Sequence, residues 1–116
     1  MGEPTESVAL RHPWQQIKVT RMPFPQQAPR LFTRAGTESN AIGQRGCYGL
    51  FRPGLWVYVG KSNDIRARLL EHLAETGTLI KSLKPTHFVA MVTANGDAQE
   101  TALIIELRPA ANQRIG

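Results

Sequence analysis

Five polar residues in the second half of the chain have side chains that can carry out hydrolytic chemistry. They are two phenols, a guanidinium, an imidazole and a carboxylate, contributed by Tyr48, Tyr58, Arg68, His72 and Glu100. Together such groups can bind a metal ion, orient a water molecule and neutralise a phosphate. Arg68 and His72 are four residues apart, so they share one face of a helix. Whether all five form one site depends on the elements that carry them.

The strands that must position the two tyrosines follow from β-rich runs in the middle of the chain. Cys47–Phe51 and Leu55–Val59 are separated by Arg52-Pro-Gly, which predicts a hairpin of two antiparallel strands. His87–Thr93 is predicted as a third strand, closed by a turn at Asn95-Gly96. Both tyrosines are therefore expected on neighbouring strands of one hairpin.

A helix is predicted to carry the arginine and the histidine of the set. Asn63 or Asp64 can cap it, its apolar residues recur at helical spacing, and Gly77 is a plausible stop. A short turn of helix is expected around Leu79–Leu83, before Pro85 interrupts it.

A second long helix is predicted to carry Glu100. Asp97 is expected to cap it, and Pro109 to stop it after about Leu107. Because its apolar residues point almost all round, we expect it to be the buried helix of the domain. The order of elements predicts an α/β (α+β) fold, with a small three-stranded mixed or antiparallel sheet flanked by helices.

The length of 116 residues leaves room for one folded domain. We place that domain in residues 45–116. Residues 1–44 contain five prolines, and only Trp14–Met22 alternates as a strand would. We interpret this first segment as a basic, proline-rich arm that wraps the domain or orders on a partner.

The net charge of +5 lies entirely in the first 61 residues, and ten of the 14 basic residues are arginine. Arginine pairs with phosphate through two parallel hydrogen bonds, so a polyanion is the natural partner. A mildly basic composition also occurs in proteins that need charge only for solubility. Composition alone therefore leaves nucleic acid and plain solubility about equally favoured.

Several classes of protein are excluded or disfavoured by the sequence. The apolar runs are too short to span a bilayer, and the start of the chain has no signal-peptide pattern, so we expect a cytoplasmic protein. Its single cysteine, Cys47, excludes an internal disulfide and a cysteine-based zinc cluster.

Five separated segments resemble the motifs of the GIY-YIG nuclease family, in the order of that family. The resemblance covers residues 46–112, and in the core motifs it departs only at Cys47, where the family has isoleucine. The matching residues are Gly46-Cys47-Tyr48, Tyr58-Val59-Gly60 followed by Lys61-Ser62, Arg68 with His72, Glu100-Thr-Ala-Leu-Ile, and Pro109-Ala-Ala-Asn112. Each motif is weak alone, and the five in register are specific.

The resemblance implies a metal-dependent endonuclease. It implies that Glu100 is the only protein ligand of a Mg²⁺ or Mn²⁺ ion, that Arg68 faces the scissile phosphate, and that Tyr48 is the general base or aligns the attacking water. Tyr58 would hydrogen-bond phosphate or water, and His72 would assist proton transfer with a pKa near neutrality.

Other matched residues are expected to position the site or its substrate. A free phenol has a pKa of about 10, so the proposed base needs positive charge nearby, from the metal, the helical arginine or Lys61. Gly46, Gly60 and Asn112 are implied to hold the site in place. The residues expected to contact nucleic acid are Lys61, Arg45, Arg52, Arg34 and Arg30.

Every one of these residues also has an ordinary structural interpretation. Glu100 follows Asp97 by three residues, which is the spacing of a capping box. Arg68 can pair with Glu71 or Glu75 on its own helix. Tyrosines are common in strands, and a single histidine on a helix is usually exposed. Only their joint occurrence at the family's spacing favours the nuclease.

The expected partner is DNA, duplex or branched, with RNA not excluded and no membrane. A domain this small has no base-reading module, so sequence-specific cutting would need a homodimer or a larger protein partner. The alternative function is a GIY-YIG-fold nucleic-acid-binding or accessory module with weak or no catalysis.

Overall fold

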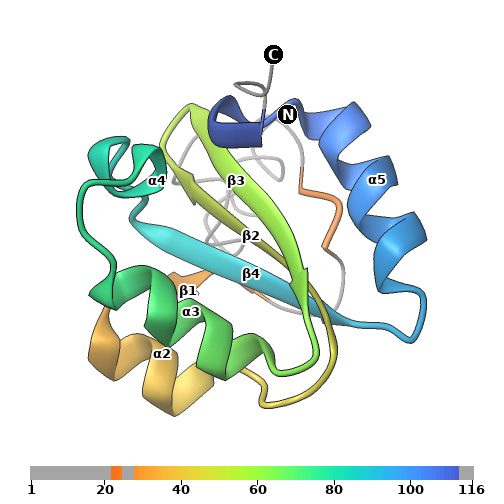
Figure 1. Ribbon diagram of the computed structural model, residues 1–116, viewed down its shortest axis with the longest axis horizontal. Helices are drawn as coiled ribbons and strands as arrows, with labels where there is room; N and C mark the ends of the chain where they lie inside the picture. The colour runs from red at the N-terminus through yellow and green to blue at the C-terminus, as the bar shows by residue number, and fades with distance from the viewer. Residues whose placement is uncertain (1–21, 25–27, 113–116) are drawn as a thin grey trace, which may run out of the picture.

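The sheet is built around the predicted hairpin. In the computed structural model, which describes residues 22–24 and 28–112, β2 (Gly46–Arg52) and β3 (Leu55–Ser62) pair antiparallel. β4 (His87–Val92) pairs antiparallel with β2, and β1 (Arg30–Leu31) pairs with β4, giving the order β1-β4-β2-β3. The predicted fold class is confirmed (Figure 1). The sheet has four strands and not three, because β1 adds an edge.

Helices cover both faces of this sheet (Figure 1). They are α2 (Arg34–Asn40), α3 (Ile65–Ala74), α4 (Leu79–Ser82), α5 (Gly96–Leu107) and the 3-10 helix η2 (Ala110–Asn112). The side chain of Asp64 accepts a hydrogen bond from the Ala67 N–H, which confirms one of the two predicted caps of α3. α4 forms just before Pro85, as expected.

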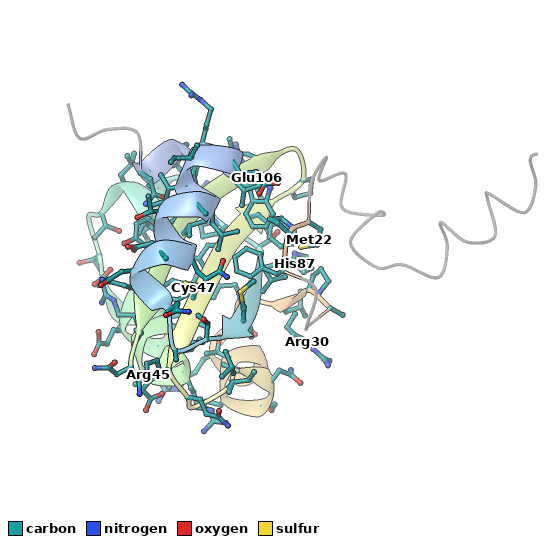
Figure 2. The ribbon with its side chains drawn as sticks, turned by 90° about the vertical axis from the view of Figure 1, so that its right-hand side faces the viewer. Met22, Arg30, Arg45, Cys47, His87 and Glu106 are labelled. Carbon is teal, nitrogen blue, oxygen red and sulfur yellow. The ribbon has the colours of Figure 1, made fainter. Side chains whose placement is uncertain are left out.

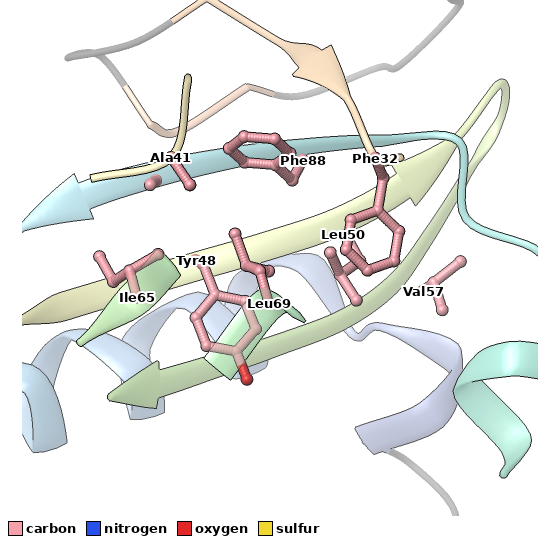
Figure 3. Close-up of a cluster of buried hydrophobic side chains, with 9 residues drawn as sticks. Phe32, Ala41, Tyr48, Leu50, Val57, Ile65, Leu69 and Phe88 are labelled. Atoms are coloured by element: carbon pink, nitrogen blue, oxygen red, sulfur yellow. The ribbon is translucent and has the colours of Figure 1, made fainter. Parts of the chain in front are cut away.

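The two faces of the sheet have separate apolar cores. On one face, Tyr48 and Leu50 from β2 pack with Phe88 from β4 and with Ile65 and Leu69 from α3. Figure 3 shows this cluster, with the hydroxyl of Tyr48 pointing out of it. On the other face, a cluster that includes Cys47, Phe51 and Val59 packs against Leu103 of α5. α3 and α5 therefore lie on opposite faces of the sheet.

A β-bulge changes the direction of side chains in β3. Leu50 pairs with Tyr58 and the next residue, Phe51, pairs with Trp56, so Val57 is an extra residue without a partner in β2. As a result Val57 and Tyr58 both pack on the α3 face, although neighbouring residues of a regular strand point to opposite faces. The bulge thus lies next to a tyrosine of the candidate site.

The prediction that α5 is the buried helix of the domain is wrong. Only Leu103 is buried in this helix, and Ile105 is 70% exposed. α5 packs with one side on the sheet, so its remaining apolar residues face outward or lie at the margin of the contact. The predicted cap is also wrong, because Asn95 is the N-cap residue and Asp97 instead pairs with Lys61.

Part of the segment that we expected to be an arm belongs to the packed structure. Phe24 and Phe32 are buried, one in each core, and Ala41 is buried beside α3. β1 and α2 were not expected from the sequence, since a two-residue strand and a seven-residue helix with little apolar periodicity leave a weak signal. The strand expected over Trp14–Met22 lies outside the described residues, apart from its last residue.

Within the described residues, no helix combines the length and the hydrophobicity that crossing a bilayer requires.

Candidate active site

A buried hydrogen bond joins β2 to α3 at the centre of the candidate site. The hydroxyl of Tyr48 lies 2.8 Å from Nε2 of His72. Tyr48 is 1% exposed and His72 is 3% exposed, so neither side chain is the idle surface residue of the ordinary interpretation. The hairpin and the helix thus bring together two of the five residues that the sequence singled out.

Gly60 makes room for the ring of Tyr48. The two residues are partners in the β2–β3 register. A Cβ atom at residue 60 would lie 2.5 Å from the Tyr48 hydroxyl and 2.8 Å from Cε2 of Tyr58. Gly46 is packed just as closely, because a Cβ atom there would meet the carbonyl oxygen of Met91 on β4. The two motif glycines are thus required by close packing at these positions.

Tyr58 is the more accessible of the two tyrosines. Its ring centroid lies 6.2 Å from that of Tyr48 and 5.5 Å from that of His72, where the two rings meet edge to face. The ring is partly exposed. The bulge at Val57 points Tyr58 toward α3, where its ring meets those of Tyr48 and His72 in one cluster.

A cleft opens over this cluster, between α3, α4 and η2. It has a volume of about 370 Å³, at the lower end of the range for ligand-binding clefts. From the predicted site, Tyr58, Arg68 and His72 line it, and Glu75 is on the same wall. The other wall comes from residues that were not predicted to belong to the site, namely Gly77, Thr78, Leu79, Ile80 and Ala111.

Arg68 is held in the cleft by two acidic residues of its own helix. Its Nη1 lies 2.8 Å from Oε1 of Glu71 and 3.4 Å from Oε2 of Glu75, as the structural interpretation expected. Burial lowers the pKa of Arg68, but the hydrogen bond to Glu71 and nearby charges raise it above its usual value overall. The guanidinium is therefore a permanent positive charge at the cleft.

Burial controls the protonation of the hydrogen-bonded pair. It raises the pKa of Tyr48 well above its ordinary value of 10.0, and Tyr58 adds to this, while Arg68 acts in the opposite direction. Burial and the charge of Arg68 lower the pKa of His72 below 6.5, against the effect of Glu75. Positive charge near Tyr48 is present as expected, but it does not outweigh burial. The resting pair is therefore a neutral phenol hydrogen-bonded to a neutral imidazole.

Glu100 lies on α5 and does not line this cleft. Its carboxylate is half-buried and forms no hydrogen bond or ion pair with the described part of the chain. Second to burial, its charge raises the pKa of Tyr58, so it acts on the tyrosine cluster. Residues 22–24 and 28–112 contain no group of three or more His, Cys, Asp or Glu side chains placed to hold a metal. A lone carboxylate suits a hard cation that keeps most of its water ligands.

Asn112 closes the outer edge of β3. Its Nδ2 donates to the carbonyl of Val59 at 3.0 Å, and its Oδ1 accepts from the Val59 N–H at 2.9 Å. The amide thus pairs with β3 as a neighbouring strand would. This contact fixes the strand next to Tyr58, which agrees with the positioning role expected for Asn112.

The five residues expected to contact nucleic acid do not gather on one surface. Arg45 and Lys61 line one depression beside the start of α5. Arg52 lies at the opposite end of β2 from Arg45, about 20 Å away at the rise of a strand. Arg30 and Arg45 lie on different sides of the molecule (Figure 2). Arg34 pairs with Glu38 on α2. Nucleic-acid contact by these residues stays a prediction.

Solved structures of one bacterial domain are similar to this chain. A point mutant of the GIY-YIG N-terminal endonuclease domain of UvrC from Thermotoga maritima, bound to its catalytic divalent cation, is 25% identical, with a TM-score of 0.56, over 64% of this chain and 88% of that chain. The same domain bound to magnesium is 25% identical, with a TM-score of 0.55, over 62% of this chain and 86% of that chain. No family model and no curated protein matches the sequence. The similar structures thus have the fold of the same family whose motifs the sequence resembles.

Proposed function

We propose that this chain, which has the fold of the GIY-YIG endonuclease domains and the motifs of that family in order, is a metal-dependent endonuclease. It would hydrolyse phosphodiester bonds in DNA. The observation that carries the proposal is the convergence of Tyr58, Arg68 and His72 in one cleft, with Tyr48 hydrogen-bonded to His72 beneath it. Each of these side chains comes from a separate motif.

Arg68 binds the scissile phosphate in this proposal. Its guanidinium is charged at every working pH and lies in the cleft beside Tyr58. A fixed cation stabilises the charge that develops on phosphate oxygens in the transition state, and it does so more strongly in a partly buried site than in water. Tyr58 has an accessible ring beside it and is placed to hydrogen-bond the phosphate or the attacking water.

His72 and Tyr48 supply the proton-transfer path. Because the resting imidazole is neutral, its Nε2 can take the proton of the Tyr48 hydroxyl while that phenol accepts a proton from water. The phenol is buried, so it acts at the base of the cleft and Tyr58 acts at its surface. In this assignment His72 takes part in the proton transfer.

Glu100 holds the divalent cation. A bound Mg²⁺ or Mn²⁺ ion would supply charge neutralisation and would polarise the phosphate. Three observations support this assignment. Glu100 is partly exposed, its carboxylate forms no ion pair within the described residues, and its charge raises the pKa of Tyr58.

The proposed substrate is DNA, with the basic residues of the first half contacting its backbone. Net charge and arginine content support a polyanionic partner. Arg45 and Lys61 line a depression at one end of the sheet, where Asp97 pairs with Lys61. A homodimer or a larger protein partner would supply the sequence specificity that this domain lacks.

Cleavage assays test the proposal. Plasmid, branched DNA and RNA are incubated with Mg²⁺ or Mn²⁺ and with wild type, Arg68→Ala or Arg66→Ala. Arg66→Ala is the control, because it removes one positive charge from α3 at a residue that does not line the cleft. We expect Arg68→Ala to lower the rate by about 100- to 1,000-fold and Arg66→Ala to cut as wild type does. Binding without cutting in both metals would favour the accessory module instead.

A further inference from the structure

One carboxylate reaches both the arginine and the histidine of the cleft. Glu75 is the C-cap residue of α3, where its backbone is already extended. Its Oε2 lies 3.4 Å from Nη1 of Arg68, and its Oε1 lies 3.3 Å from Nδ1 of His72. From the sequence Glu75 was only a solvated partner of the arginine. The structure places it on the wall of the cleft, in contact with two of the proposed functional side chains.

The hydrogen bonds around His72 determine where its proton lies. A neutral imidazole donates from one nitrogen and accepts at the other. The phenol of Tyr48, 2.8 Å from Nε2, can donate or accept, whereas the carboxylate of Glu75, 3.3 Å from Nδ1, can only accept. Both contacts are satisfied together when Nε2 accepts from Tyr48. The proton is then on Nδ1, and Glu75 is the acceptor that faces it. Three side chains thus form a continuous chain from Tyr48 through His72 to Glu75.

We propose that Glu75 is a positioning residue that holds His72 with its proton on Nδ1, so that Nε2 is free to take the proton of Tyr48. The proposal rests on the proposed function and deepens it. When the proton moves, the O–H bond of Tyr48 breaks and an N–H bond forms at Nε2, leaving a phenolate and an imidazolium. The carboxylate of Glu75 stabilises that imidazolium, as a carboxylate does for histidine in other hydrolases.

Glu71 provides a matched control on the same helix. It also binds Arg68, at 2.8 Å, but it forms no hydrogen bond with His72 in the described structure. The other charged or titratable groups that face His72 are Tyr48 and Tyr58 from the sheet and Arg68 from α3, and Lys81 and Lys84 line a hollow beside it. Exchanging either residue removes a contact to Arg68, but only exchanging Glu75 removes the hydrogen bond to His72.

The first test is cleavage kinetics with Mg²⁺. We expect Glu75→Ala to lower kcat by about 10- to 100-fold with KM unchanged, the range found when a carboxylate that orients a metal-bound histidine is removed. Glu75→Gln should lie between this variant and wild type, because its amide oxygen still accepts from Nδ1. Glu71→Ala, which affects the arginine but not the hydrogen bond to His72, should lower kcat less than Glu75→Ala does. Equal loss of kcat in the two alanine variants would overturn the proposal.

The pH dependence of kcat separates positioning from a loss of structure. Burial and the charge of Arg68 lower the pKa of His72. Among the groups that raise this pKa, Glu75 has the largest effect. Removing Glu75 lowers that pKa further, so the acidic limb of the profile should move to lower pH in Glu75→Ala. Glu71→Ala should move it less. An acidic limb that stays in place in Glu75→Ala would contradict the proposal.

The second test does not depend on activity. The ¹⁵N shifts of the His72 ring, measured by NMR on the full chain, report which nitrogen carries the proton. We expect Nδ1–H in wild type and in Glu75→Gln, and a mixture of tautomers in Glu75→Ala. If the protein cuts no DNA but these shifts are found, the proposed function fails and the positioning by Glu75 stands. A wild-type ring protonated on Nε2 would overturn the positioning whether or not DNA is cut.

Discussion

Tyr48 and Gly60 face each other across β2 and β3, and the phenol ring lies over the position that a side chain at residue 60 would occupy. This relationship links the two motifs that were matched on the hairpin. Because Gly60 has no side chain, the ring of Tyr48 can occupy the space beside it. With that space filled, the Tyr48 hydroxyl is at hydrogen-bond distance from His72.

Replacement of Gly60 by alanine should therefore destabilise the protein by about 1 to 3 kcal/mol, because the new methyl group overpacks the cluster against Tyr48 and Tyr58. Gly96→Ala is the control, since its added Cβ would be 3.7 Å or more from its neighbours. Urea unfolding measures both variants. Equal free energies of unfolding for the two would contradict the packing that we describe.

The amide of Asn112 should contribute measurably to stability. Asn112→Ala removes two hydrogen bonds to Val59 and leaves the edge of β3 unpaired at that point, which should cost about 1 to 3 kcal/mol. Asn95→Ala is a suitable comparison, because the side chain of Asn95 makes no capping hydrogen bond. Chemical denaturation would show similar losses for both variants if Asn112 had no such role.

The stability of the protein should fall in mildly acidic solution because of His72. Its pKa in the folded state is below the ordinary value of 6.5, so the unfolded chain binds the proton first as the pH drops. The free energy of unfolding should decrease as the pH falls below about 6.5 toward the folded pKa. His72→Gln should make this decrease shallower, and His87→Gln, at a less buried site, should change it less. Parallel pH profiles for wild type and His72→Gln would disprove this.

The thiol of Cys47 should be unreactive in the folded protein. Burial, together with the charge of Glu100, raises the pKa of Cys47 to about 11, and the side chain is fully buried under α5. Only the thiolate reacts with disulfide reagents such as DTNB. We expect slow release of one equivalent of the coloured product in native buffer and rapid release in denaturant. Rapid reaction of the native protein would show that this face of the sheet is open.

Local signals in the sequence predicted the elements that carry the site. Asp64 caps α3 as its position indicated, and Arg68 and His72 share a helix face because they are four residues apart. The pairing of the two tyrosine strands followed from the turn at Arg52-Pro-Gly. These features depend on residues that are close in the chain, which is why pattern and spacing were sufficient.

Features that depend on tertiary packing were not predictable. The extra residue Val57 turns Tyr58 toward α3, and no local pattern marks that bulge. The spacing of Glu75 and His72 allows their contact, but only the packing of His72 against Tyr48 gives that contact a place in the site. α5 carries an exposed Ile105 because one side of the helix is enough to cover the sheet. Each of these depends on how elements are placed relative to one another.

The most direct measurement of the central claim is Mg²⁺-dependent plasmid cleavage by wild type, Glu100→Gln and Glu106→Gln. Each of the two variants removes one negative charge from α5. We predict that wild type and Glu106→Gln cut at similar rates as Mg²⁺ is increased. Glu100→Gln should show no more cleavage than wild type in EDTA. Cleavage by Glu100→Gln at the wild-type rate and with the same Mg²⁺ dependence would contradict the account.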